Sequence, residues 1–301
     1  MPLDNSEYRK YLLPARLVFF DLDGTIIPST AASGRRIAIS LSTYTRVRQF
    51  AQANFGLAGL PEIDRELCSD WYRDHGGPQG LINRILEDTR IEGDVKDCLM
   101  FYFNGLFNRR LTQYLREDLQ HDKVPEEHLQ ALRSISAEAS IILVSYRYQT
   151  QLEFLCSLQA LQLDRNGLFG PHNAFAVGEP GTSSDGSKAR FVGSMWRREI
   201  RAQRRLTSAI GKTFAPIVIG DATRDVHFAV DVGGIFFGVG ETGEDSAETL
   251  LAEIKRQGNN LHARSRVFRS LADKALQKRL LEECSEYKKA VASLKPETRQ
   301  G

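Results

Sequence analysis

The chain has 301 residues, of which 42% are hydrophobic and 26% are charged. These proportions are ordinary for a folded globular protein and exclude a disordered or fibrous chain. Forty Lys and Arg against 38 Asp and Glu leave a formal charge of +2. This balance points to neither a nucleic-acid nor a membrane partner, and we expect neither.

The four cysteines are widely spaced and form no Cys-x-x-Cys pair of the kind found in zinc and redox motifs. The N-terminal segment 1–10 lacks the basic start and apolar stretch of a signal peptide, and no later segment resembles a membrane span. We therefore expect a cytoplasmic protein with reduced thiols.

The first element expected is a buried strand at 17–20, Leu-Val-Phe-Phe, which stops at Asp21 and a Gly-Thr turn. A short apolar run of this kind is typical of a parallel sheet with both faces covered. From Pro28 to about Glu138 the pattern becomes helical. Gly- and Pro-rich breaks divide it into expected helices at 35–55, 62–74, 78–89, 95–119 and 125–135.

Three more apolar runs, at 141–144, 217–219 and 235–237, are predicted strands, and a weaker run lies at 174–177. Helical patterns at 151–161 and 188–210 alternate with them. The second pattern contains Arg197, Arg198, Arg201, Arg204 and Arg205, which we expect to be solvated and spread over more than one face. A charged helix is expected at 272–293.

Alternating strands and helices predict an α/β fold, with a parallel sheet between two helical layers. We expect a discontinuous core at 1–30 and 137–262 and a helical domain inserted at 31–136. Residues 263–301 are expected to form a charged C-terminal helix and tail, which could pack on the core or mediate homo-oligomerisation.

Asp21 and Asp23 follow the first strand directly and can point into one crevice at the carboxyl end of the sheet. Two carboxylates in such a place repel unless a cation or hydrogen bonds compensate them, and a hard divalent ion would do so. The motif alone is equally consistent with a strand-ending turn, because Asp and Gly are common turn residues.

The other strand ends favour a catalytic site. Ser145 follows the second long strand, and Asp221 and Asp225 follow the strand at 217–219. Lys188 begins the helix that precedes that strand. Carboxylates for a metal ion, together with a hydroxyl and an ammonium for phosphate oxygens, form a coherent site for phosphoryl transfer.

In these four motifs and their order, the sequence resembles the haloacid dehalogenase-like hydrolases. The matches are Asp21-Leu22-Asp23-Gly24-Thr25, Ser145, Lys188, and Gly220-Asp221 with Asp225. The resemblance covers roughly residues 15–30 and 138–240. It implies a Rossmann-like three-layer core and an inserted cap typical of the phosphoglycolate phosphatase-like branch.

The resemblance also implies the role of each residue. Asp21 would be the nucleophile and Asp23 the general acid and base. Magnesium would be held by Asp21, Asp23 through its main-chain carbonyl, Asp221 and Asp225. The phosphate would be bound by Ser145, Lys188 and the turn residues Gly24 and Thr25.

Two features depart from the family pattern. Tyr146 and Arg147 follow the Ser145 hydroxyl where the family often has small or amide residues, so both are candidate substrate contacts. The segment from Lys188 to Asp221 is also longer than usual, which makes Lys212 a weaker candidate for the lysine role.

The predicted function is a magnesium-dependent phosphatase that acts on a small phosphate monoester. Two alternatives remain: a phosphomutase of a sugar phosphate, and a non-catalytic protein that binds phosphate esters. Substrate choice would fall to cap side chains. The candidates are Tyr44, Arg46, Arg48, Trp71, Tyr72, Arg73, His75, Arg84, Arg109 and Arg110.

Overall fold

The computed structural model describes residues 10–28, 32–74, 78–117, 124–147, 152, 168–170, 172–177, 188–211, 214–241, 243, 245–261 and 263–294. The helix expected at 151–161, Lys212 and His75 lie outside this part of the chain, as do the side chains of Tyr72 and Arg73. No helix in the described ranges combines the length and the apolar character needed to cross a bilayer.

The core is a six-stranded sheet in which every neighbouring pair of strands is parallel, in the order β3-β2-β1-β4-β5-β6. The strands are β1 (Arg16–Phe20), β2 (Ala139–Ser145), β3 (Ala174–Ala176), β4 (Ile217–Gly220), β5 (Ile235–Val239) and β6 (Arg266–Phe268). All five strands expected from the sequence are confirmed. The edge strand β6 was missed, since it lies where a charged helical tail was expected.

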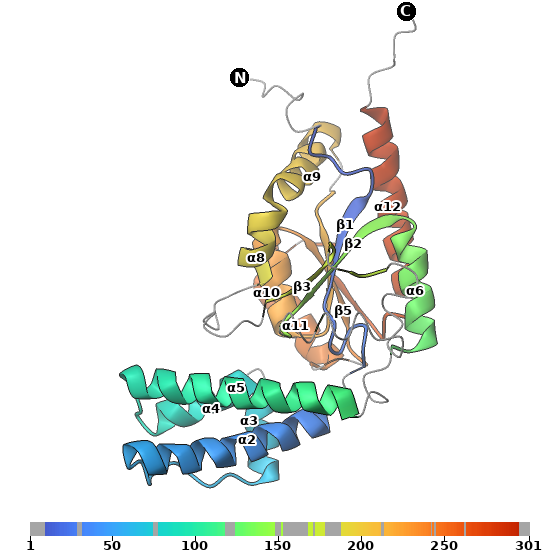
Figure 1. Ribbon diagram of the computed structural model, residues 1–301. Helices are drawn as coiled ribbons and strands as arrows, with labels where there is room; N and C mark the ends of the chain where they lie inside the picture. The colour runs from blue at the N-terminus through green and yellow to red at the C-terminus, as the bar shows by residue number, and fades with distance from the viewer. Residues whose placement is uncertain are drawn as a thin grey trace, which may run out of the picture. The chain divides into compact units, whose positions relative to one another are not determined.

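Helices cover both faces of this sheet, as its apolar strands require. Helices α10 (Thr223–Val232) and α11 (Ala247–Gln257) lie on one face beside α8 (Lys188–Met195) and α9 (Arg197–Ile210), and α6 (Glu126–Ser136) and α12 (Lys274–Ser293) lie on the other (Figure 1). A short 3-10 helix, η2 (Gly258–Asn260), follows α11. The α/β class with a three-layer Rossmann-like core is confirmed.

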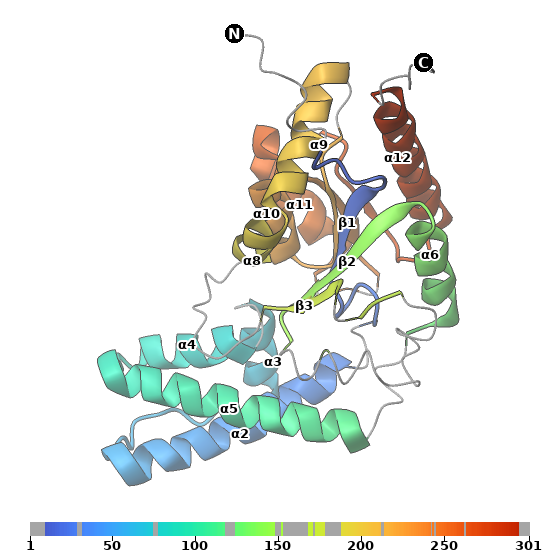
Figure 2. The same ribbon diagram turned by 45° about the horizontal axis from the view of Figure 1, so that its top comes forward.

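Two alternate side chains of β1 contribute to the core that lies under α10. Leu17 and Phe19 belong to a buried cluster that includes Phe228 and Val232 of α10, and the Phe19 and Phe228 rings meet edge to face at 5.6 Å. In the rotated view, β1 and β2 run side by side between the helical layers (Figure 2). Because β1 is buried along its whole length, the residue that follows it has a fixed position.

The chain divides into two compact units. The first contains all six strands together with α6 and α8 to α12. The second contains α2 (Ala32–Phe55), α3 (Arg65–Asp74), α4 (Pro78–Asp88) and α5 (Gly93–Glu117). In this second unit the rings of Phe50 on α2 and Tyr102 on α5 stack at 4.2 Å between centroids.

The observed units differ from the expected domain boundaries at two places. Helix α6, which the sequence placed in the insertion, belongs to the first unit because it packs on β2 and α12. Strand β6 and helix α12 also belong to that unit, in the segment where the sequence predicts a charged helix and tail that could pack on the core. The buried ion pair of Arg16 with Glu283 ties α12 to the start of β1.

Candidate active site at the strand ends

Asp21 stands at the carboxyl end of the central strand β1. Its main-chain N–H donates to the Ile219 carbonyl of β4 at 2.9 Å, so the parallel pairing continues one residue past the strand. Its side chain is buried. The sheet therefore fixes both the position and the environment of this carboxylate.

Lys188, the first residue of α8, bridges two of the expected site carboxylates. Its buried Nζ donates to Asp21 Oδ1 at 2.6 Å and to Asp225 Oδ1 at 2.7 Å. Burial acts to lower the pKa of Lys188, but the Asp21 and Asp225 carboxylates outweigh it and raise that pKa above its ordinary value. Lys188 is therefore a fixed positive charge.

Asp21, Asp221 and Asp225 form a buried cluster with one oxygen from each residue within 4.8 Å of the others. These carboxylates with the Lys188 ammonium leave an excess of two negative charges among the four groups. Burial raises the pKa of Asp21, and the Lys188 ammonium opposes that rise. Asp21 Oδ2 is buried without a hydrogen-bond partner among the described residues. This all-oxygen donor set fits a hard divalent cation.

The Gly24 turn places its backbone against Asp221. Gly24 has a φ of +84°, and a Cβ added there would lie 1.9 Å from Asp221 Oδ2. Only glycine fits this position, for both conformational and steric reasons. Gly24 N–H donates to the Ile27 carbonyl at 2.6 Å, and the Thr25 hydroxyl donates to Asp221 Oδ1 at 3.1 Å. The sequence predicts Gly24 and Thr25 as phosphate-binding residues. In the structure the Gly24 N–H closes the turn and the Thr25 hydroxyl orients the Asp221 carboxylate.

Arg147 donates two hydrogen bonds to the carboxylate of Asp23. Its Nε donates to Asp23 Oδ2 at 2.9 Å, and a terminal nitrogen donates to Asp23 Oδ1 at 2.6 Å. This parallel fork is the strong, directional mode of Arg–carboxylate pairing. Arg147, which the sequence makes a candidate substrate contact, thus pairs with Asp23, the second carboxylate of the first motif.

Ser145 and Tyr146 lie beside this pair. Ser145 is buried, and its Oγ accepts a hydrogen bond from the Arg147 main-chain N–H at 3.2 Å. Tyr146 is 38% exposed. Its ring lies 5.1 Å from Lys188 Nζ and 5.4 Å from the Arg224 guanidinium carbon. Tyr146 therefore brings a partly exposed aromatic surface next to the site cations.

Asp245 is a site residue that the sequence reasoning missed. Its Oδ2 accepts from the Thr223 N–H at 2.6 Å at the start of α10, and its own N–H donates to the Asp221 carbonyl at 3.1 Å. Asp245 thus supports the loop that carries Asp221. It follows β5 in a Gly-rich stretch with no motif, so only the fold reveals it.

The four motifs, scattered over 205 positions from Asp21 to Asp225, converge at the carboxyl ends of β1, β2 and β4. The hydrogen bonds of Lys188 directly join the first, third and fourth motifs. Ser145 ends β2, the neighbour of β1 in the sheet. The site therefore lies where polar ligands bind in parallel α/β sheets.

No family model matches the sequence, and no curated protein matches it. Solved structures match over most of the chain. A β-phosphoglucomutase from Clostridium difficile aligns over 90% of this chain and 98% of its own, with 15% identity and a TM-score of 0.51. A phosphonoacetaldehyde hydrolase-like protein from Oleispira antarctica aligns over 91% and 95%, with 12% identity and a TM-score of 0.51.

A third match is a HAD family hydrolase from Deinococcus radiodurans, solved with bound phosphate and sodium. It covers 90% of this chain and 96% of its own, with 17% identity and a TM-score of 0.47. The two structures with TM-scores of 0.51 show that the chain shares their fold. This agrees with the fold that the resemblance to the haloacid dehalogenase-like hydrolases implied.

Proposed function

We propose that this protein is a magnesium-dependent phosphatase that hydrolyses a small phosphate monoester through an aspartyl-phosphate on Asp21. The observation that carries the proposal is the Asp21 carboxylate itself. One oxygen is held by Lys188, and the other is buried without a hydrogen-bond partner among the described residues. This leaves one oxygen for a metal ion or for phosphorus.

Asp21, Asp221 and Asp225 would hold the magnesium ion, together with the main-chain carbonyl of Asp23. The bound ion would neutralise phosphate oxygens and the charge that develops during transfer. The excess of two negative charges in the cluster with Lys188 matches one divalent cation.

Asp21 attacks phosphorus, so that a bond from its carboxylate oxygen forms while the bond to the ester oxygen breaks. Asp23 gives a proton to the departing oxygen. In the second half, Asp23 takes a proton from water, and the resulting hydroxide attacks phosphorus and releases Asp21 and inorganic phosphate. The Arg147 fork binds the ionised form of Asp23, so one of its two hydrogen bonds must open when Asp23 carries the proton for the first transfer. The closed fork then orients Asp23 as the base of the second transfer, and Lys188 and Ser145 hold phosphate oxygens.

The direct test is a panel of phosphorylated metabolites assayed for phosphate release with magnesium and with EDTA. We expect turnover that depends on the metal. In Asp21→Asn it should fall at least about a thousandfold, because a carboxamide is not a nucleophile. An unchanged circular dichroism spectrum would show that this variant is folded. Undiminished turnover in Asp21→Asn would refute the mechanism.

Phosphomutase activity is the second candidate, since the similar structures include one named as a β-phosphoglucomutase. Both activities would use Asp21 in the same way and differ in what accepts the phosphoryl group. Phosphorus NMR of a sugar phosphate incubated with the protein separates them: isomerised sugar phosphate indicates a mutase, and free phosphate indicates a phosphatase.

A further inference from the structure

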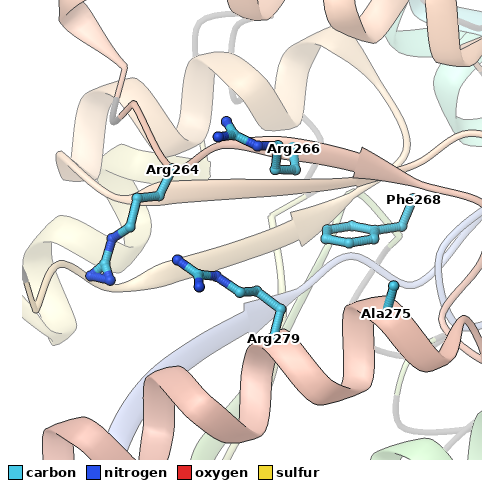
Figure 3. A pocket seen from close by; sticks show the side chains of 5 residues that line it. All are labelled: Arg264, Arg266, Phe268, Ala275 and Arg279. Carbon is cyan, nitrogen blue, oxygen red and sulfur yellow. The ribbon is translucent and has the colours of Figure 1, made fainter.

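A pocket of about 420 Å³ lies between the edge strand β6 and helix α12, outside the strand-end site. Arg264, Arg266, Phe268, Ala275 and Arg279 line it (Figure 3). Pockets for small molecules typically have volumes of about 300 to 1,000 Å³. The size suits a small ligand, and none of the lining residues takes part in the proposed phosphatase chemistry.

The local structure explains why these side chains meet. Arg266 and Phe268 are two residues apart on β6 and therefore lie on one side of the strand. Ala275 and Arg279 are four residues apart on α12 and share one face of the helix. In the close view, the Arg279 side chain extends from the helix toward the region where the Arg264 guanidinium lies (Figure 3).

The charges around the pocket do not balance. The buried Glu283 carboxylate accepts from Arg16 at 2.5 Å through one oxygen, and from Arg264 at 2.6 Å and Arg279 at 2.9 Å through the other. One negative charge thus serves three guanidinium groups. Arg266 adds a fourth, whereas Glu282 supplies only a long contact of 3.8 Å to Arg279.

Among these residues that the structure describes, four guanidinium groups stand against two carboxylates, an excess of two positive charges. Three of the four line the pocket. Arg264 and Arg279 keep 26% and 40% of their side-chain surfaces exposed, so solvent reaches them. A concave surface lined by one sign of charge concentrates counter-ions.

We propose that this pocket binds a small anion with two or more negative charges, on phosphate or carboxylate groups. Planar guanidinium groups recognise both through paired hydrogen bonds. The Phe268 ring, packed edge to face on Phe237 at 5.5 Å, forms a rigid apolar wall for a carbon-containing part of the ligand. The small volume and paired cations favour a metabolite-sized anion.

The test is calorimetric titration of the full-length, EDTA-treated protein with pyrophosphate and, separately, with citrate. Wild type is compared with Arg266→Gln and with the double variant Arg266→Gln/Arg279→Gln. Losing one charged contact should weaken binding about tenfold, and losing both should weaken it further. The stronger of the two probes assigns the class as phosphate or carboxylate.

Arg266→Gln is the safer variant for folding, because Arg266 is exposed and its terminal nitrogen donates to the Ala263 and Ser265 carbonyls nearby. Arg133→Gln on α6, which removes an exposed ion pair with Glu126, is the matched control and should bind as wild type does. Affinities that are equal in wild type and the double variant, or no binding of either probe, would overturn the proposal. Because the readout is binding without metal, the outcome does not depend on turnover at Asp21.

Discussion

At the scale of single residues, the arginine that holds Asp23 is the feature that the motif pattern least anticipated. The family pattern that the sequence resembles often has a small or amide residue after the second-motif hydroxyl. In this chain Arg147 instead makes two hydrogen bonds to Asp23, the second carboxylate of the first motif. The role of Arg147 in positioning Asp23 can be measured, because the need for proton donation by Asp23 depends on the leaving group of the substrate.

We expect Arg147→Gln to slow hydrolysis of an alkyl phosphate by about tenfold to a hundredfold, which is at or below the lower end of the contribution of general acid catalysis. An aryl phosphate with an acidic leaving group should be affected much less, because it hardly needs a proton to depart. Steady-state kinetics with both substrates measures the difference. Arg147→Lys, which keeps the charge without the fork, should show the same pattern, and equal losses on both substrates would contradict a positioning role.

Gly24 gives a second prediction at this scale. Backbone strain at a positive φ costs about 1 to 3 kcal/mol by itself. Gly24→Ala should lower the free energy of unfolding by more than this, because the added Cβ also clashes with Asp221. Gly93→Ala is the matched control, because Gly93 has a φ of +62° and nothing within 4 Å of an added Cβ. Urea unfolding of both variants separates the clash from backbone strain. Equal losses would mean that Asp221 moves aside without cost.

At the scale of elements, the ends and faces of helices depended on contacts that a sequence pattern does not contain. The expected helix 188–210 is two helices, α8 and α9, which meet at Trp196. The five arginines of α9 are all exposed, as expected of a solvated charge cluster, while Ile200, Ala202 and Leu206 of the same helix are buried. Strand β6 was missed because it has only three residues and an exposed Arg266.

The buried Arg16–Glu283 ion pair, which joins α12 to β1, leads to a prediction about stability. Arg16 also donates to the Ala215 carbonyl, through Nε at 2.9 Å and through Nη2 at 2.6 Å. The Arg16 guanidinium group therefore connects β1, the segment just before β4 and helix α12. Glu283→Gln should lower the free energy of unfolding by about 3 to 5 kcal/mol, because it leaves a buried cation without its counter-charge. Chemical denaturation measures this loss.

The double variant Arg16→Met/Glu283→Leu should recover much of that stability, because apolar side chains replace both of the fully buried charges. The two other arginines that contact Glu283, Arg264 and Arg279, are partly exposed and stay hydrated. If the double variant were as unstable as Glu283→Gln, the loss would come from packing and not from an unpaired charge.

At the scale of the whole molecule, each of the two compact units contains a buried thiol whose ionisation makes stability depend on pH. Cys68 lies in the second unit and Cys284 in the first, and both are completely buried. Burial raises the pKa of each thiol from 9.0 to about 11. The folded state therefore disfavours the thiolate that the unfolded chain forms readily.

The sign of the pH effect follows from these shifts. A raised folded-state pKa gives stability that is complete below the unfolded pKa and is lost as the pH rises toward the folded pKa. The free energy of unfolding should fall between pH 9 and about 11. The Cys68→Ala/Cys284→Ala variant should lose less stability over the same interval, and urea melts across that range measure both. Parallel curves for variant and wild type would exclude the thiols as the cause.

Much of the core was predictable because its signals are local. A buried parallel strand must be apolar and must stop at polar residues, so Leu17 to Phe20 and the strands that follow were visible in the sequence, as were Asp21, Asp221 and Asp225 at their ends. Periodicity likewise located the helices of the insertion to within a few residues.

The sequence by itself determined the α/β class, the order of the polar motifs along the chain and the set of charged residues at the site. Only the tertiary structure decided their pairing: Lys188 with Asp21 and Asp225, Arg147 with Asp23, Asp245 with Thr223, and Glu283 with its three arginines. The reason is physical. A residue's periodicity is set by its neighbours in the chain, whereas the partner of a buried charge is set by which distant elements the sheet brings within hydrogen-bonding distance.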